Sequence, residues 1–501
     1  MKKINFKIPF FASVILLLVI LGFYFTNGSS AGTNANSKFE NGNHTPKYIF
    51  YFIADGLAMP HLQMTEATLP YIATNRENIK TLNIRRFEHT GFSTTHAKTR
   101  YITGSAAAGT ALATGQKTSI GTIAKTGDHS QNLTSIAKAA KNQDMRVGII
   151  SSVSIDHATP AVFYANADSR SHYNYIASQM ASSDFDYFGG GYAAGNFEKN
   201  RAPDRNPEEY QALDIEKLMQ ENGYYISKSN DDFKNLKAGK NWVFSSYNKT
   251  DGSLSYEIDR KTNELSLSQY TEKAIELLEN KNGFFIMVEG GKIDWASHAN
   301  DAATVAGEVL AFDNAVGKAL EFYEKYPDET LIIVTSDHET GGLGLGFSGM
   351  KYESDYRLLG GQKISAASFS EKADKWIESK LNFDKVMDSV SYYFGLNDTS
   401  VYSSAKLSRE DYERIETAYN KSISGLDKSM KDYIIYGSYN PFTTIVTRVL
   451  NEKAGIAWTT YSHTAGPVPV FAKGVGESQF TGYYDNTDIH RKIMNTAKLN
   501  K

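Results

Sequence analysis

Short runs of apolar residues recur along the chain, and each is about as long as a strand buried on both faces of a sheet. The run at residues 284–288 (Phe-Phe-Ile-Met-Val) is unbroken. Similar runs occupy residues 47–54, 147–151, 331–335 and 468–472. These five runs predict buried strands.

Apolar residues at helical spacing occupy residues 132–143 and, in a longer series, residues 302–323. Both segments predict amphipathic helices lying between the strands. Strands that alternate with helices favour parallel pairing, because the helices carry the chain back across the sheet. We therefore expect an α/β fold in which helices sandwich a central, mostly parallel sheet.

Two regions have the character of insertions. Residues 196–265 are polar and weakly patterned, and no role is assigned to them. Residues 346–456 are rich in charge and tyrosine at helical spacing. Within them, Ser408-x-x-Asp411 is a helix-capping pattern and Pro441 opens a further amphipathic stretch. We expect residues 346–456 to form a helical lid or crown.

The N-terminal segment has the pattern of an export signal. Three lysines in the first seven residues precede an apolar run at residues 9–25, and residues 29–31 are small, as a signal peptidase requires. We expect residues 1–31 to be a signal peptide or an uncleaved N-terminal anchor, and residues 32–45 a flexible linker. We then expect the body, residues 46–501, to be exported, and so to be periplasmic, secreted or at the cell surface. It contacts a membrane only if the anchor is uncleaved.

The amino-acid composition excludes several classes of partner and of metal ligand. The net charge of -3 means that the chain lacks the excess of positive charge typical of proteins that bind DNA or RNA. The 501 residues include no cysteine, which excludes disulfides, zinc–thiolate sites, a lipoprotein anchor and a thiol nucleophile. Histidines and carboxylates therefore remain as the candidate metal ligands.

Acidic residues and a histidine follow the ends of the predicted strands. Ligands of open α/β sheets bind at the edge formed by the carboxyl ends of the strands. The residues placed there are Asp55, Asp156, Glu289, Asp294, Asp337 and His338. Four such placements in one chain indicate a site.

Asp294 and His298 are four residues apart, so that on a helical turn they project from the same face. Together with Glu289 they form a metal-site arrangement at the end of a core strand. The alternative is a solvated Asp–His pair at the start of a surface helix.

Ser105 precedes a run of small residues that ends at Gly115, a typical helix stop. A serine at a helix N-terminus lies where free amide groups stabilise an anion, although a plain N-cap is the usual explanation. Its hydroxyl needs a base or a metal to become a nucleophile, and no Gly-x-Ser-x-Gly elbow surrounds it. Two metals about 4 Å apart can hold the attacking and the leaving oxygens.

Taken together, these segments resemble the alkaline phosphatase family from about residue 47 to the C-terminus, in the same order. The resembling motifs are Asp55-Gly56, Ser105-Ala106-Ala107, Ala158-Thr159-Pro160, Val288-Glu289-Gly290, Asp294-x-x-x-His298, Thr335-Ser336-Asp337-His338-Glu339 and Ser462-His463-Thr464. The resemblance implies a metal-dependent phosphomonoesterase with the fold of that family.

The resemblance also implies ligands for three cations. The ligands of one zinc ion, beside the leaving oxygen, would be Asp294, His298 and His463. Those of a second zinc ion, which binds the Ser105 alkoxide, would be Asp55, Asp337 and His338. Those of a magnesium ion would be Asp55, Thr159 and Glu289. The residue types agree, since carboxylates with histidines suit zinc and an all-oxygen set suits magnesium.

Arg170 resembles the phosphate-binding arginine of the family, and its planar fork suits two phosphoryl oxygens. The implied reaction is in-line attack by Ser105, a phosphoserine intermediate, and hydrolysis by zinc-bound hydroxide. The implied substrates are small-molecule phosphate monoesters. Members of the family commonly form homodimers, so the resemblance also implies a homodimer.

The chain departs from the family pattern near the site. Gly104 stands where many members have Asp, and Ala58 where a glycine is more typical. His157 and Trp295 occupy variable positions that we expect in the outer shell of the metals. Two alternatives stay open: a phosphodiesterase of the same superfamily, and a non-catalytic surface protein that binds metal or phosphate.

Overall fold

The computed structural model describes residues 44–72, 81–200, 212–427 and 429–499. The predicted signal peptide or anchor, and nearly all of the predicted linker, lie outside the described residues. Everything below concerns the unit formed by residues 44–501. Within its described part, no helix is both long enough and apolar enough to cross a membrane.

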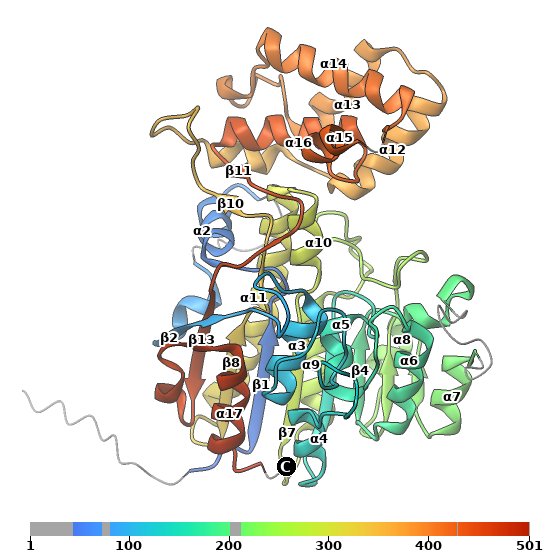
Figure 1. The fold of residues 1–501 in the computed structure, drawn as a ribbon, viewed down its shortest axis with the longest axis vertical. Helices are drawn as coiled ribbons and strands as arrows, with labels where there is room; N and C mark the ends of the chain where they lie inside the picture. Colours follow the sequence, from blue (N-terminus) through green and yellow to red (C-terminus); the bar gives the residue numbers. More distant parts are fainter. Residues whose placement is uncertain (1–43, 73–80, 201–211, 428, 500–501) are drawn as a thin grey trace, which may run out of the picture. The chain divides into compact units, whose positions relative to one another are not determined.

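A ten-stranded sheet forms the centre of this unit (Figure 1). Its strand order is β14-β2-β13-β8-β1-β7-β3-β4-β6-β5. The strands are β1 (Tyr48–Ile53), β2 (His89–Thr94), β3 (Arg146–Ser151), β4 (Tyr187–Gly190), β5 (Tyr225–Ser227), β6 (Asn241–Val243), β7 (Phe284–Glu289), β8 (Thr330–Thr335), β13 (Val468–Gly474) and β14 (Gly482–Asp485). The five predicted strands are all present, within one or two residues of their predicted bounds.

Pairing in the sheet is mostly parallel, as predicted. The exception is β13, which runs antiparallel to both β8 and β2. Short strands β5 and β6 come from residues 196–265, the region to which no role was assigned from its pattern. These strands are only three residues long, so the periodicity that marks a strand has no room to develop.

Helices cover both faces of the sheet, because the side chains of β1 alternate between two hydrophobic clusters. Phe50 and Phe52 belong to the first cluster, Ile49 and Tyr51 to the second. The first face carries α2 (Met59–Thr68), α9 (Leu267–Leu278) and α11 (Ala302–Lys325). The second carries α3 (Ser105–Thr114), α4 (Ile136–Lys141), α5 (Ala158–Tyr164), α6 (Tyr173–Ser182) and α17 (Asn486–Thr496). This confirms the predicted sandwich, and α4 is shorter than predicted because Ser135 caps it.

The segment predicted as a lid or crown lies between two short strands, β10 (Leu343–Gly344) and β11 (Ala457–Trp458), which pair with each other. We call residues 346–456 the crown. Its helices are α12 (Ala366–Glu378), α13 (Phe383–Phe394), α14 (Arg409–Ser424), α15 (Met430–Tyr436) and α16 (Pro441–Ala454). Figure 1 shows these orange helices on the side of the sheet to which the parallel strands point.

The remaining regular elements of the described chain are short or lie at its edges. They are α7 (Ile215–Glu221), α8 (Asn230–Lys234), α10 (Lys292–His298), β9 (Glu339–Thr340), β12 (His463–Thr464) and the 3-10 turns at 83–86, 194–196, 198–200, 356–361, 403–405 and 477–480. Two of these, α10 and the antiparallel pair β9–β12, carry candidate ligands.

Candidate active site

The candidate residues lie together at the carboxyl ends of the central strands. Ile53 at the end of β1 is in register with Glu289 on β7 and Thr335 on β8. The three chains therefore leave the sheet at the same level, and the polar residues that follow are brought into one place. Gly56 allows the turn after β1, because it has a φ of +82° and a Cβ there would lie 2.8 Å from the Cα of Asp294.

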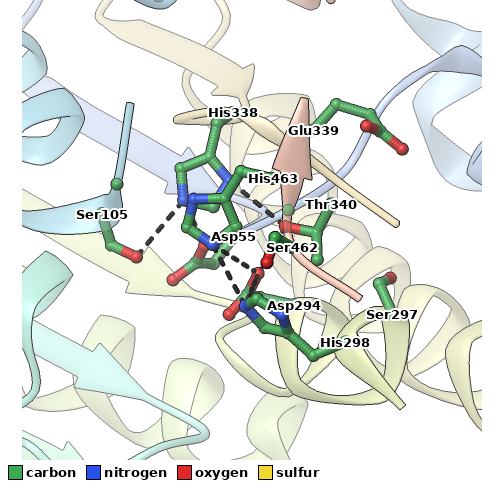
Figure 2. Close-up of polar contacts among 12 residues, drawn as sticks. Asp55, Ser105, Asp294, Ser297, His298, His338, Glu339, Thr340, Ser462 and His463 are labelled. Carbon is green, nitrogen blue, oxygen red and sulfur yellow. Dashed lines mark hydrogen bonds and ion pairs between the residues drawn. The ribbon is translucent and has the colours of Figure 1, made fainter. Parts of the chain in front are cut away.

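The first group of ligand atoms comes from α10 and β12. Asp294 Oδ1 lies 3.4 Å from His298 Nε2 and 3.6 Å from His463 Nε2. The two imidazole nitrogens are 3.1 Å apart, so they face a common point. Figure 2 shows the three side chains converging. The resemblance to the family implied this set of three, from motifs far apart in the chain.

Backbone carbonyls orient both imidazoles of this group. His298 Nδ1 lies 2.6 Å from the carbonyl oxygen of Tyr461, and His463 Nδ1 lies 2.8 Å from that of Thr103. A carbonyl accepts but cannot donate, so each Nδ1 carries the hydrogen. Each Nε2 is then left with a lone pair aimed at the common point, which is how a neutral histidine presents itself to a metal.

The second group consists of Asp55, Asp337 and His338, all fully buried. His338 Nε2 lies 3.5 Å from Asp55 Oδ1 and 3.3 Å from Asp337 Oδ2. Neither carboxylate oxygen has a hydrogen-bond donor among the described residues. Buried, unsatisfied carboxylate oxygens are costly unless a cation meets them, so the group fits a metal ion. Asp337 and His338 share one point because β8 has ended at Thr335 and the backbone turns there.

The third group of metal-ligating side chains is Asp55, His157 and Glu289. Thr159 joins it, since its hydroxyl donates to Asp55 Oδ2 over 3.3 Å. Glu289 Oε2 accepts from Ser151, whereas Oε1 has no donor within the described chain. Asp55 thus belongs to two groups, as expected for a bridging carboxylate. His157, expected in the outer shell, has a ring nitrogen within ligand distance of this group.

Charge and burial make the carboxylates depend on cations. Burial, with the like charges of neighbouring carboxylates, raises the pKa of Glu289 to about 8 and that of Asp337 to about 7. The same causes raise the pKa of Asp55 well above its usual range. Divalent cations would supply the charge that keeps these groups ionised.

Asp294 differs from these three carboxylates. Burial opposes its ionisation, but the adjacent His298 and His463 outweigh burial and lower its pKa below the usual range. Conversely, burial is outweighed for His298, because Asp294 and the Tyr461 carbonyl raise its pKa to about 9. In the absence of a cation, a proton on His298 therefore compensates Asp294.

Ser105 lies beside the second group as the first residue of α3, where it is buried. Gly104 takes the N-cap position, so the simple N-cap explanation for Ser105 is wrong. Its Oγ faces His338 Nε2 at 3.3 Å (Figure 2). The hydroxyl therefore points at the second group of ligands, next to the free amides of the helix N-terminus.

Arg170 follows α5 and is held by His157, whose Nε2 lies 2.7 Å from Arg170 Nη2. The ring of His157 packs edge-on against Trp295, with centroids 5.7 Å apart. Beside Gly104 there is open space, since a Cβ there would meet only His463 at 3.9 Å. Because Gly104 stands where many family members have an aspartate, Arg170 has no acidic partner at that position. His157 contacts Arg170 instead and positions it.

The sequence did not reveal the partners that orient the ligands. Thr340 is the main example, because its hydroxyl donates to Asp294 Oδ1 and lies 3.3 Å from His338 Nδ1. It therefore links the first group to the second. The adjacent motif ending at Glu339 could have pointed to it, but a lone threonine carries no signal of its own.

Comparisons with known proteins identify the family of the chain. Alkaline phosphatase 4 of Bacillus subtilis is 29% identical over 466 residues, which cover 90% of this chain and 89% of that protein. The crystal structure of a cold-active alkaline phosphatase from Shewanella sp. is 28% identical, with a TM-score of 0.71 over 90% of this chain and 99% of that one.

A Thermus thermophilus alkaline phosphatase superposes with a TM-score of 0.73 at 25% identity, covering 91% of this chain and 92% of the other. A mutant of the alkaline phosphatase from the Antarctic bacterium TAB5, with Mg bound in its M3 site, is 27% identical, with a TM-score of 0.62 over 91% of this chain and 99% of that one. The family model for alkaline phosphatase matches residues 46–499, and the chain belongs to that family.

Proposed function

We propose that this protein hydrolyses phosphate monoesters through a phosphoserine on Ser105, with two zinc ions and one magnesium ion. The observation that carries the proposal is the position of Ser105 Oγ, 3.3 Å from His338 Nε2 of the second ligand group, whose neighbour is a further convergent group of ligands. A hydroxyl so placed can attack phosphorus while the opposite group receives the leaving oxygen.

The donor sets fit these ions. Asp294, His298 and His463 offer one oxygen and two nitrogens, and Asp55, Asp337 and His338 offer two oxygens and one nitrogen. Such mixed sets suit zinc, whereas Asp55, Thr159 and Glu289 form an oxygen set that suits magnesium. When bound, the cations would act as Lewis acids that lower the pKa of the hydroxyl and neutralise charge on the leaving oxygen.

The residues of the chain then carry out two displacements. Ser105 Oγ forms a bond to phosphorus as the bond to the ester oxygen breaks, and the alcohol departs. Arg170 donates to two non-bridging oxygens throughout, held at its angle by His157. Water next attacks the phosphoserine, which releases inorganic phosphate and restores the Ser105 hydroxyl.

Export and assembly are also part of the proposal. The basic and apolar N-terminal pattern supports a periplasmic, secreted or cell-surface location. Family membership supports a homodimer. Fractionation of the producing cells and light scattering on the purified protein test these two points separately.

The test of function compares the wild type with Ser105→Ala. The wild type is expected to hydrolyse p-nitrophenyl phosphate, and Ser105→Ala to lose this activity. Ser297→Ala is the matched control, since Ser297 is a buried serine close by whose hydroxyl bonds only within α10, to Ile293. Equal rates for the wild type and Ser105→Ala would refute the serine mechanism.

Two further measurements separate the alternatives. Acid quenching during turnover, followed by mass spectrometry, should find phosphate on the peptide containing Ser105. Elemental analysis of protein purified without chelator should find about two zinc and one magnesium per chain. Faster turnover of bis-p-nitrophenyl phosphate than of the monoester would favour a phosphodiesterase, and metal without any turnover would favour a binding protein.

A further inference from the structure

A cavity of about 280 Å³ lies between α10 and the crown helices α12 and α16. Figure 1 shows these three helices on the same side of the sheet. The walls are mainly aromatic and small apolar side chains, among them Tyr256, Trp295, Ala367 and Tyr439. A concave, largely apolar space of this size suits one fused ring system.

His298 connects this cavity to the candidate active site. It lines the cavity, and it also belongs to the ligand group that would receive the leaving oxygen. Trp295 makes a second connection, because its ring lines the cavity and packs against His157, which holds Arg170. The cavity therefore begins where the alcohol of a phosphate ester would emerge.

Some polar groups in the lining are already engaged. His298 Nδ1 is engaged by the Tyr461 carbonyl, and the Thr444 hydroxyl donates to the carbonyl of Asn440 within its own helix. The buried hydroxyls of Thr443 and Thr447 have no hydrogen-bond partner among the described residues, so an occupant meets rings and methyl groups together with two hydroxyls. Burial of apolar ligand area against the rings and methyl groups contributes favourably to the free energy of binding.

The wall opposite the crown is held in place. Lys292 is buried, and its Nζ lies 3.6 Å from the centre of the Tyr256 ring and 5.5 Å from that of Trp295. It also donates to the carbonyl of Leu254 over 2.9 Å. One cation therefore fixes both aromatic walls before any ligand arrives.

A second cavity, of about 570 Å³, shares Tyr256, Trp295 and Ala367 with the first. Its other lining residues are mostly polar or charged, including Lys249, Asp251 and Glu371, and it does not include His298. It is therefore a poorer candidate for the group attached directly to the leaving oxygen.

We infer that the smaller cavity receives the alcohol part of the substrate, and that the enzyme prefers phosphate monoesters of aromatic or other flat apolar alcohols. This inference rests on the proposed function. It adds a substrate class to a site that otherwise holds only the phosphoryl group.

The test fills the cavity from its crown side. Ala367 is an exposed position on α12, so Ala367→Trp adds a ring to the cavity without disturbing the buried face of the helix. We expect kcat/KM for 2-naphthyl phosphate to fall about tenfold and that for ethyl phosphate to change less than about twofold. Inhibition by inorganic phosphate should be unchanged. Lys375→Trp, at an exposed position of α12 that does not line the cavity, is the control.

A second variant removes a wall. Tyr439→Ala takes away a partly exposed ring and should lower kcat/KM for 2-naphthyl phosphate about fivefold, again sparing ethyl phosphate. Equal changes for both substrates in both variants, or no change in either, would overturn the inference and leave the proposed function standing. A wild type that hydrolyses neither substrate would refute the proposed function, and this inference with it.

Discussion

The active site and the crown are built in opposite ways. The site draws Asp55, Ser105 and His463 from distant parts of the chain, and its ligands are buried or half-buried at one edge of a sheet. The crown is a continuous segment of amphipathic helices, and most begin at a residue whose side chain caps the first turn, such as Ser365, Asn382 and Ser408. One region depends on tertiary convergence and the other largely on local signals.

This difference suggests a division of roles, in which the sheet edge carries out the reaction and the crown influences which substrates fit. A change at the sheet edge alters the charge balance among the candidate ligands, whereas we expect a change in the crown to alter mainly the walls of the cavity. The two regions are joined at Tyr461, because its hydroxyl bonds Arg448 and the Ile435 carbonyl of the crown while its own carbonyl orients His298. Away from this contact, we expect the crown to vary in sequence without moving a ligand. The following predictions test this division, from the largest expected effect to the smallest.

Removing one ligand should have the largest effect. His463→Ala leaves Asp294 and His298 without their third partner, so we expect kcat/KM for every phosphate monoester to fall by at least about 10³-fold, or about 4 kcal/mol. Steady-state kinetics and zinc content should change together. His96→Ala, at a half-buried histidine outside the ligand groups, is the control, and a loss confined to large substrates would contradict the division.

Damage to the core of the crown should be costly to stability but not to chemistry. Ile415→Ala removes a fully buried side chain from α14 and should lower the local free energy of unfolding by about 3 kcal/mol. Amide hydrogen exchange in α14 and α16 measures this, with the exposed Ile423→Ala as control. The rate on ethyl phosphate should stay within about twofold, and a collapse of that rate would show that the crown supports the ligands.

Chelation should make stability depend on pH. In the metal-free fold, Glu289 and Asp337 keep protons up to pKa values of about 8 and about 7, whereas the unfolded chain loses them near pH 4. The fold then binds more protons than the unfolded chain, so its free energy of unfolding falls as pH rises from about 5 to about 8.

Urea unfolding with and without chelator measures this dependence. The metal-loaded protein should show a flatter profile across the same interval, because its carboxylates are ionised in both states. If the free energy of unfolding of the chelated protein rose with pH, the predicted direction would be wrong. The raised pKa values of Glu289 and Asp337 would then not hold in the metal-free fold.

The smallest effect should come from a cap in the crown. Ser408 and Asp411 form a capping box at the start of α14, so Ser408→Ala should cost about 1 kcal/mol. Hydrogen exchange at the first turn of α14 reports it, with Ser424→Ala at the far end of the helix as control. No kinetic parameter should change.

Sequence patterns predicted the parts of the molecule that have strong periodicity or strong chemistry. The buried strands and the long helix α11 could be located because each has a distinct pattern, and acidic residues at the strand ends pointed to a site there. The division of the candidate ligands into groups came from the resemblance to the family. The antiparallel direction of β13 could not, because an apolar run does not encode its orientation.

Partners contributed by the backbone were also beyond the sequence. The carbonyls of Tyr461 and Thr103 orient two imidazoles, yet any residue can offer a carbonyl. The contact between His157 and Arg170 likewise depends on how the loop after α5 folds. Contacts that depend on shape rather than residue type appear only in three dimensions.

The pairing of β12 with β9 determines when the candidate site can form during synthesis of the chain. His463 and Thr464 lie beside Thr340 and Glu339, and the ring of His463 reaches a carbonyl 360 positions earlier in the chain. In a nascent polypeptide the candidate site therefore stays incomplete until residues 463–464 have been synthesised and β12 has paired with β9. A chain cut short before His463 lacks one of the three side chains of the first ligand group.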